Sequence, residues 1–289
     1  MIIGACGLVG RALWVEAEQR GQEVLALDRE ALLPGCREMA LPKGDGLLAI
    51  CGQSCAEWVV FAAGLSWVDY CEDHPAESWE HNVVVPAEAA SAAASFGAGF
   101  IFFSSDYIFD GYAGPYTEEA TPHPLSVYGK HKMEAETLVR AKNPNHIIIR
   151  TTVIYGPEPR GKNFVYQVLT SVKEGRKLSI ASDQKSTPTY SGDLGRGALD
   201  LIENNRMGTI HLAGPECLDR YSFALEICRV FGQSPATLSA SSTALLNQKA
   251  ARPLKAGLRT ERAQSLLAWK FLPPSTGLQK MKQTLEAAS

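Results

Sequence analysis

The first half of the chain alternates short apolar runs with longer amphipathic stretches, and this alternation constrains the fold more than any other feature. Short runs of consecutive apolar residues are typical of strands buried on both faces of a parallel sheet. The intervening stretches 10–20, 86–96 and 127–141 have helical spacing, with Glu134 and Glu136 expected to face solvent. The pattern predicts an α/β fold with a doubly wound parallel sheet. The expected strands are Met1–Ile3, Glu23–Leu27, Trp58–Phe61, Gly99–Phe103 and His146–Ile149.

The alternation of expected strands and helices ends after Arg150, where segments rich in glycine and proline, expected to be loops, alternate with expected helices. No internal repeat or low-complexity linker divides the chain, which argues against fully independent domains. We expect a first domain over residues 1–154, to which 190–213 contributes. A smaller mixed lobe is expected over 155–189 and 214–289.

Composition excludes several classes of partner. The formal net charge is −3 and the sequence has no basic block, so nothing in it indicates binding to nucleic acid. No apolar run approaches the length that a membrane-spanning helix needs. Seven scattered cysteines, with no cleavable leader ahead of them, favour a reducing cytoplasm. Cys51 and Cys55 form a C-x3-C pair without a matching second pair, and the histidines do not cluster, so no metal site is expected. Small molecules are the expected ligands.

A glycine-rich turn follows the first expected strand and precedes the first helix. Gly4, Gly7 and Gly10 give the spacing G-x-x-G-x-x-G, which lets backbone N–H groups approach a pyrophosphate at the positive end of the helix. The next strand ends in Asp28, where an acidic side chain meets the ribose hydroxyls of a dinucleotide. Together they predict a Rossmann domain. The cofactor contacts expected in the turn are Gly4, Cys6, Gly7, Leu8, Val9 and Gly10.

The residues at the ribose leave the choice of cofactor open. Arg29 would pair with a ribose 2′-phosphate and favour NADP, whereas Asp28 would repel that phosphate and favour NAD. Only Met1–Ile3 precede Gly4, so the first strand is unusually short. Either the true start lies upstream or this strand is clipped.

A tyrosine and a lysine stand four residues apart in the expected helix 127–141. Tyr128 and Lys132 therefore share one helix face, where the ammonium is expected to lower the phenol pKa from about 10 toward the working range. Tyr128 would then exchange a proton with a carbonyl oxygen, and Lys132 would tune it and hold ribose hydroxyls. Ser105, at the carboxyl edge of strand 99–103, is the expected donor to that oxygen, with Ser104 as the fallback. The set predicts carbonyl reduction with NAD or NADP.

Taken together, these motifs resemble those of the extended short-chain dehydrogenases, and within them those of the dTDP-4-dehydrorhamnose reductases. The resemblance implies a catalytic triad of Ser105, Tyr128 and Lys132. It rests on Gly4–Gly10, Ala62–Gly64, Val68–Asp69, Asn82–Pro86, Ser104–Gly111, Tyr128–Lys132, Arg150–Gly156, Asp183–Gln184, Thr187–Tyr190 and Arg252–Leu254. Further cofactor contacts are expected at Ala62, Ala63, Gly64, Asn82, Ser104, Tyr128, Lys132 and Val153. Substrate contacts that it implies are Ser105, Asp106, Tyr107 and Tyr128, with residues of the later lobe.

The resemblance also implies a nucleotide-linked 4-keto-6-deoxy sugar as substrate, and a homodimer. Two positions depart from the family pattern near the expected sugar pocket, with Tyr70 in place of lysine and Val153 in place of tryptophan. One alternative is a non-catalytic NADP-binding subunit, similar to the regulatory subunit of methionine adenosyltransferase. Another is a sugar-nucleotide epimerase or dehydratase, although segment 187–190 and the short chain favour a reductase.

Overall fold

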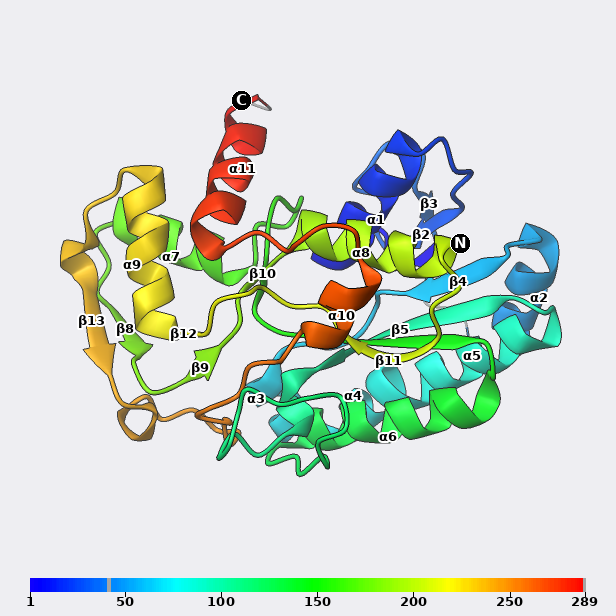
Figure 1. The fold of residues 1–289 in the computed structure, drawn as a ribbon, viewed down its shortest axis with the longest axis horizontal. Coiled ribbons are helices and arrows are strands. Elements are labelled where there is room, and N and C mark those ends of the chain that lie inside the picture. Colours follow the sequence, from blue (N-terminus) through cyan, green and yellow to red (C-terminus); the bar gives the residue numbers. More distant parts are fainter. Residues whose placement is uncertain (41–42, 288–289) are drawn as a thin grey trace.

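The computed structural model describes residues 1–40 and 43–287, with a seven-stranded parallel sheet at its centre (Figure 1). The strand order is β11-β6-β5-β4-β1-β2-β3. This is the order of a doubly wound dinucleotide-binding sheet, and it confirms the predicted α/β Rossmann architecture. The strands are β1 (Ile2–Ile3), β2 (Ala26–Asp28), β3 (Arg37–Glu38), β4 (Trp58–Phe61), β5 (Gly99–Ser105), β6 (His146–Thr151) and β11 (Gly208–His211).

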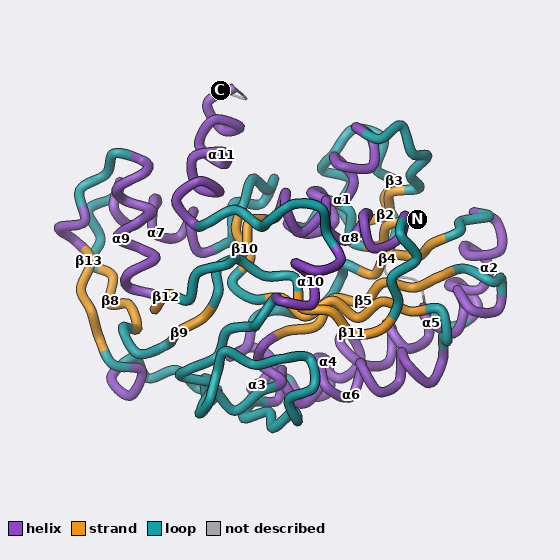
Figure 2. Tube along the Cα trace, viewed as in Figure 1, coloured by secondary structure: helices purple, strands orange, loops and turns teal. Residues whose placement is uncertain are grey.

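The central strands are buried on both faces, as their apolar runs predict. In β6, Ile147 and Ile149 belong to one hydrophobic cluster and Ile148 belongs to the cluster on the opposite face. Helices α1 (Leu8–Gln19) and α8 (Ser191–Glu203) cover the first face. The second face is covered by α2 (Asp45–Ser54), α5 (Val85–Ser95) and α6 (Val127–Lys142), as Figures 1 and 2 show.

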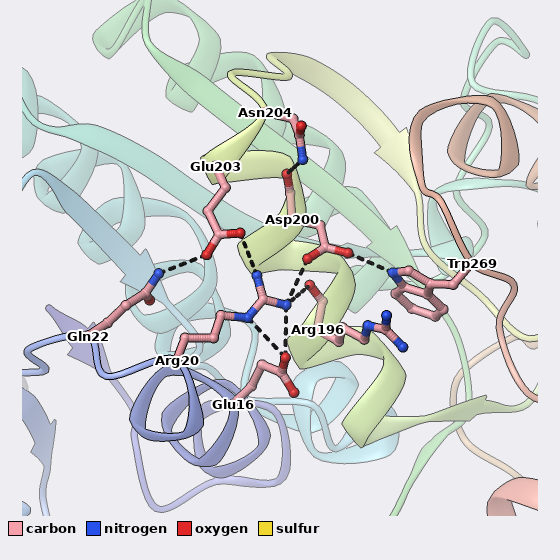
Figure 3. Close-up of polar contacts among 8 residues, drawn as sticks. All are labelled: Glu16, Arg20, Gln22, Arg196, Asp200, Glu203, Asn204 and Trp269. Atoms are coloured by element: carbon pink, nitrogen blue, oxygen red, sulfur yellow. Dashed lines mark hydrogen bonds and ion pairs between the residues drawn. The ribbon is translucent and has the colours of Figure 1, made fainter.

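Helix α8 brings a late segment of the chain back to the central sheet. A Cβ atom on Gly195 would lie 2.7 Å from the carbonyl oxygen of Ala12, so glycine permits a close approach of α8 to α1. At the end of α1, the Arg20 guanidinium pairs with Asp200 at 2.7 Å and Glu203 at 2.8 Å (Figure 3). The returning segment then adds β11 to the edge of the sheet beside β6.

One expected surface residue of α6 is buried instead. Glu136 is 1% exposed, and it accepts hydrogen bonds from Arg150 at 2.8 and 2.9 Å and from Arg140 at 2.7 Å. The prediction that Glu136 faces solvent is therefore wrong, because β6 places a buried arginine opposite it. Burial opposes ionisation, but the arginines outweigh it and the pKa of Glu136 is lowered.

A second group of elements forms its own hydrophobic cluster around Tyr155 and Phe223. Its elements are α7 (Phe164–Lys173), β8 (Leu178–Ala181), α9 (Arg220–Phe231), β13 (Leu238–Ser241) and α11 (Pro274–Ala287). They lie on the left in Figure 2. Ala263 and Leu267, in and after α10 (Glu261–Leu266), pack instead into the Rossmann cluster, which differs from the expected boundary at residue 214. The division into two domains stays a prediction.

Short elements complete the chain. They are α3 (Val68–Asp73), α4 (Pro75–Trp79), a π-helical turn (Glu80–Val84), three 3-10 turns (Asp106–Ile108, Pro235–Thr237 and Thr243–Leu245), and β7 (Ile154–Tyr155), β9 (Lys185–Ser186), β10 (Thr189–Tyr190) and β12 (Leu218–Asp219). Within the described residues, none of the helices has both the length and the apolar character to span a membrane. The same residues hold no group of three or more His, Cys, Asp and Glu side chains arranged to bind a metal ion.

Candidate active site

The glycine turn lies between β1 and α1 and fits a dinucleotide pyrophosphate. Gly4 has φ +87°, and a Cβ atom there would lie 2.7 Å from the backbone nitrogen of Ala63. A Cβ atom on Gly10 would lie 2.1 Å from the carbonyl oxygen of Gly4, so the turn requires glycine at both positions. Helix α1 begins at Leu8 without a side-chain cap. Its first N–H groups therefore suit an anionic ligand.

Asp28 lies at the carboxyl end of β2, and both of its carboxylate oxygens accept hydrogen bonds. The N–H of Cys6 donates to Oδ2 at 2.9 Å, and Arg160 Nη2 donates to Oδ1 at 3.1 Å. The Arg29 side chain is 73% exposed, with Glu30 at 3.9 Å, and is not brought to the Asp28 carboxylate. Sequence reasoning missed Arg160, because nothing in its loop sequence ties it to a residue 132 positions earlier.

Ser105 ends β5 and is fixed by its neighbours. Its hydroxyl accepts from the N–H of Tyr107 at 3.2 Å and donates to the Asp106 carboxylate at 3.2 Å. Asp106 is 2% exposed and accepts a second bond from Thr152 at 2.6 Å. Burial raises the pKa of Asp106, although both hydroxyls oppose the rise. The aspartate thus sets the orientation of the Ser105 hydroxyl.

Tyr128 lies in the first turn of α6, directly across from Ser105. The helix is capped by Ser126, whose hydroxyl accepts from the N–H of Gly129 at 3.2 Å. The Tyr128 ring meets the Tyr107 ring edge-on, with 5.8 Å between the two ring centres. Burial raises the pKa of Tyr128 above its usual range, and the nearby Ser105 hydroxyl opposes this rise only in part. Tyr128 is therefore a protonated phenol at neutral pH.

Lys132 lies one turn further along α6, on the same face. Its Nζ donates to the carbonyl oxygen of Phe103 at 2.9 Å and lies 5.9 Å from the centre of the Tyr128 ring. Burial lowers the pKa of Lys132 to about 8, although Cys71 and Glu136 act against the change. The predicted lowering of the Tyr128 pKa is wrong in this structure, because burial of the phenol, the largest cause, raises the pKa instead.

Asn82, in the π-helical turn, holds the loop after β4 beside Lys132. Its side-chain amide accepts from the N–H of Leu65 and donates to the carbonyl oxygen of Leu65, both at 2.9 Å. A Cβ atom on Gly64 would lie 2.9 Å from Asn82 Oδ1 and 4.0 Å from Lys132 Nζ. Asn82 therefore positions the loop that faces the expected nicotinamide. Ser104 is buried one residue before the end of β5, beside Glu136.

A small cavity begins at Asp106, the residue after Ser105, and reaches Arg220 at the start of α9. It is lined by Asp106, Tyr107, Thr152, Val153, Gln184, Lys185, Ser186, Arg220, Pro253 and Ala256. Val153 has φ +42°, which is strained for a β-branched residue. Tyr70 is not among the lining residues, since its hydroxyl donates to Glu77 at 2.7 Å and its ring stacks on His74. Of the two departures from the family pattern, only Val153 lines the cavity.

A Rossmann sheet with serine, tyrosine and lysine at its carboxyl edge is the arrangement of the extended short-chain dehydrogenases. The family described as RmlD substrate binding domain matches residues 1–287. The chain belongs to this family, which confirms the resemblance seen in the sequence.

Individual relatives agree with this membership. A dTDP-4-dehydrorhamnose reductase from Aggregatibacter actinomycetemcomitans is 33% identical, over 78% of this chain and 77% of the relative. The methionine adenosyltransferase 2 subunit beta of Bos taurus is 30% identical, over 80% of this chain and 71% of the relative. The crystal structure of a Bacillus anthracis dTDP-4-dehydrorhamnose reductase in complex with NADP has the same fold, with a TM-score of 0.89, 24% identity and 98% coverage of both chains.

Proposed function

We propose that this protein reduces the keto group of a nucleotide-linked 4-keto-6-deoxy sugar, with NADPH or NADH as the reductant. The observation that carries the proposal is the clustering of Ser105, Tyr128 and Lys132 at the carboxyl end of β5, next to a small cavity that reaches the second group of elements. The 33% identity to a relative named dTDP-4-dehydrorhamnose reductase supports the sugar class. The homologue of the same fold that is a complex with NADP supports the cofactor.

The reduced nicotinamide, when bound, supplies the hydride. Its pyrophosphate would be held at Gly4–Gly10 and its adenosine ribose at Asp28, with the loop 62–64 against the nicotinamide. On substrate binding, the Ser105 hydroxyl would turn from Asp106 to donate its hydrogen bond to the substrate oxygen, where it would stabilise the charge that develops. Tyr128 would deliver the proton, and its raised pKa keeps that proton available at neutral pH. The Lys132 ammonium would stabilise the charge left on the phenolate.

The test measures oxidation of NADPH and NADH by the wild-type protein with a panel of dTDP-linked 4-keto-6-deoxy sugars. dTDP-glucose, which has no ketone, serves as the control substrate. We expect turnover of at least one keto sugar, and we expect Ser105→Ala to lower kcat by about 100-fold. Ser95→Ala, which removes an exposed hydroxyl of α5, is the matched control. Cofactor binding without turnover of any keto sugar would overturn the proposal.

A second candidate is a non-catalytic NADP-binding subunit. The 30% identity to the beta subunit of methionine adenosyltransferase 2 favours it. This candidate predicts tight NADP binding, no consumption of keto sugars, and co-elution with a catalytic subunit. An epimerase or dehydratase differs from both, because it would convert a nucleotide sugar with no net consumption of NADPH.

We also propose a homodimer in a reducing cytoplasm. All seven cysteines are free thiols, which supports a reducing compartment. Sedimentation equilibrium of the purified protein tests the dimer, and fractionation of the native cells tests the location.

A further inference from the structure

A loop from beyond the first domain reaches the adenosine end of the cofactor site. Residues 156–163 follow β7, yet Arg160 contacts the carboxylate that ends β2. Pro157, in the same loop, accepts a hydrogen bond from Arg11 at 3.4 Å, and Arg11 directly follows the glycine turn. The loop thus meets the cofactor site at two places, one at the turn and one at the ribose-binding carboxylate.

The loop has internal hydrogen bonds that hold it in this position. The Glu158 carboxylate accepts from the N–H of Lys162 at 2.9 Å and from the N–H and side-chain amide of Asn163 at 2.6 and 2.8 Å. The same amide donates to the carbonyl oxygen of Gly156 at 2.9 Å. The backbone of the loop that carries Arg160 is therefore held in place by hydrogen bonds within the loop.

The charges around Asp28 explain why the position of Arg160 matters. Asp28 is 9% exposed, and Glu30 lies two residues further along the chain. Arg160 Nη2 lies 3.1 Å from Asp28 and 3.4 Å from Glu30, and its side chain is 19% exposed. Both contacts use the same nitrogen, so the opposite edge of the guanidinium is engaged by neither carboxylate. A planar guanidinium with a second edge is suited to a phosphate.

We propose that Arg160 is the specificity-determining residue that allows this site to accept the 2′-phosphate of NADPH. It offsets the charge of Asp28 and Glu30 and offers donors to the phosphate. Without Arg160, a 2′-phosphate would meet two uncompensated carboxylates, and the site would accept only the 2′-hydroxyl of NADH. The proposal rests on the dinucleotide site of the proposed function and does not depend on the sugar that is reduced.

The experiment measures binding of 2′,5′-ADP and of ADP to the full-length protein by calorimetry, so no turnover is needed. We expect Arg160→Met to weaken 2′,5′-ADP at least about tenfold more than ADP. Adding Asp28→Asn to Arg160→Met should recover part of the lost 2′,5′-ADP affinity, because it removes a repelling charge. Arg29→Met tests the neighbouring arginine and should give no such selective loss. Arg176→Met, in an exposed side chain that pairs with Glu174, controls for the loss of a surface cation.

Each result decides a separate point. Equal weakening of ADP and 2′,5′-ADP in Arg160→Met would overturn the proposal and leave Arg160 as a brace for the loop. A selective loss in Arg29→Met, with none in Arg160→Met, would assign the phosphate to Arg29. Failure of the wild-type protein to bind either nucleotide would instead reject the dinucleotide site of the proposed function.

Discussion

Lys132 is expected to be needed for activity, although burying its charge destabilises the fold. It is 7% exposed, and burial lowers its pKa from the usual 10.5 to about 8. Below pH 8 the folded protein therefore holds a charge that would be better solvated in the unfolded chain. We predict that Lys132→Met stabilises the fold at pH 7 while it abolishes carbonyl reduction, as expected where a functional site stores a destabilising group.

The magnitude follows from the two pKa values. Their separation corresponds to about 3 kcal/mol, at about 1.4 kcal/mol per pH unit. Loss of the bond to Phe103 costs about 1 kcal/mol, which leaves a net gain of about 2 kcal/mol at pH 7. Between pH 8 and 10.5 the unfolded wild-type chain binds more protons than the folded protein, so wild-type stability rises with pH. The advantage of the variant should fall by about 1 kcal/mol between pH 8 and 9.

Urea unfolding followed by circular dichroism at pH 7, 8 and 9 measures this difference. Lys130→Met, which removes an exposed lysine of the same helix, is the matched control and should show no such trend. A Lys132→Met variant that is less stable than the wild-type protein at pH 7, or whose stability difference stays flat from pH 7 to 9, would refute the reasoning.

Two further predictions concern the core and the cofactor turn. Glu136→Gln should lower the free energy of unfolding by about 3 kcal/mol, because it leaves Arg150 charged and buried without its carboxylate partner. Glu134→Gln is the control and should change the free energy of unfolding little. A loss below about 1 kcal/mol for Glu136→Gln in urea titrations would contradict the prediction. Gly10→Ala should abolish binding of NADPH, followed by nucleotide fluorescence, since its Cβ atom would lie 2.1 Å from the carbonyl oxygen of Gly4. Wild-type affinity in a folded Gly10→Ala variant would show that the turn can relax.

The sheet was largely predictable from the sequence because its central strands are apolar on consecutive residues. Strands β4, β5 and β6 carry that pattern, and the glycine turn fixes which end of the sheet receives a ligand. Strand β3 (Arg37–Glu38) is exposed and two residues long, so it has no apolar signal. Only its pairing with β2 defines it as a strand.

The site was predictable where one local rule sufficed. Helical spacing places Tyr128 and Lys132 on one face, and the end of a parallel strand places Ser105 near them. The partners of Asp28 and Glu136 come from loops and strands far along the chain, so spacing could not identify Arg160 or predict the burial of Glu136. The pKa of Tyr128 likewise depends on burial by distant elements rather than on its near neighbour in sequence.

Proton delivery by Tyr128 is the central claim, and the single-turnover rate of keto-sugar reduction with saturating NADPH tests it most directly. Tyr128→Phe removes only the hydroxyl, while Tyr112→Phe, in a ring that is 79% exposed, is the matched control. We predict that Tyr128→Phe lowers the rate at least about 100-fold, with the affinity for NADPH changed by less than about twofold, and that Tyr112→Phe reacts like the wild-type protein. A Tyr128→Phe variant that reduces the keto sugar at the wild-type rate would contradict the claim.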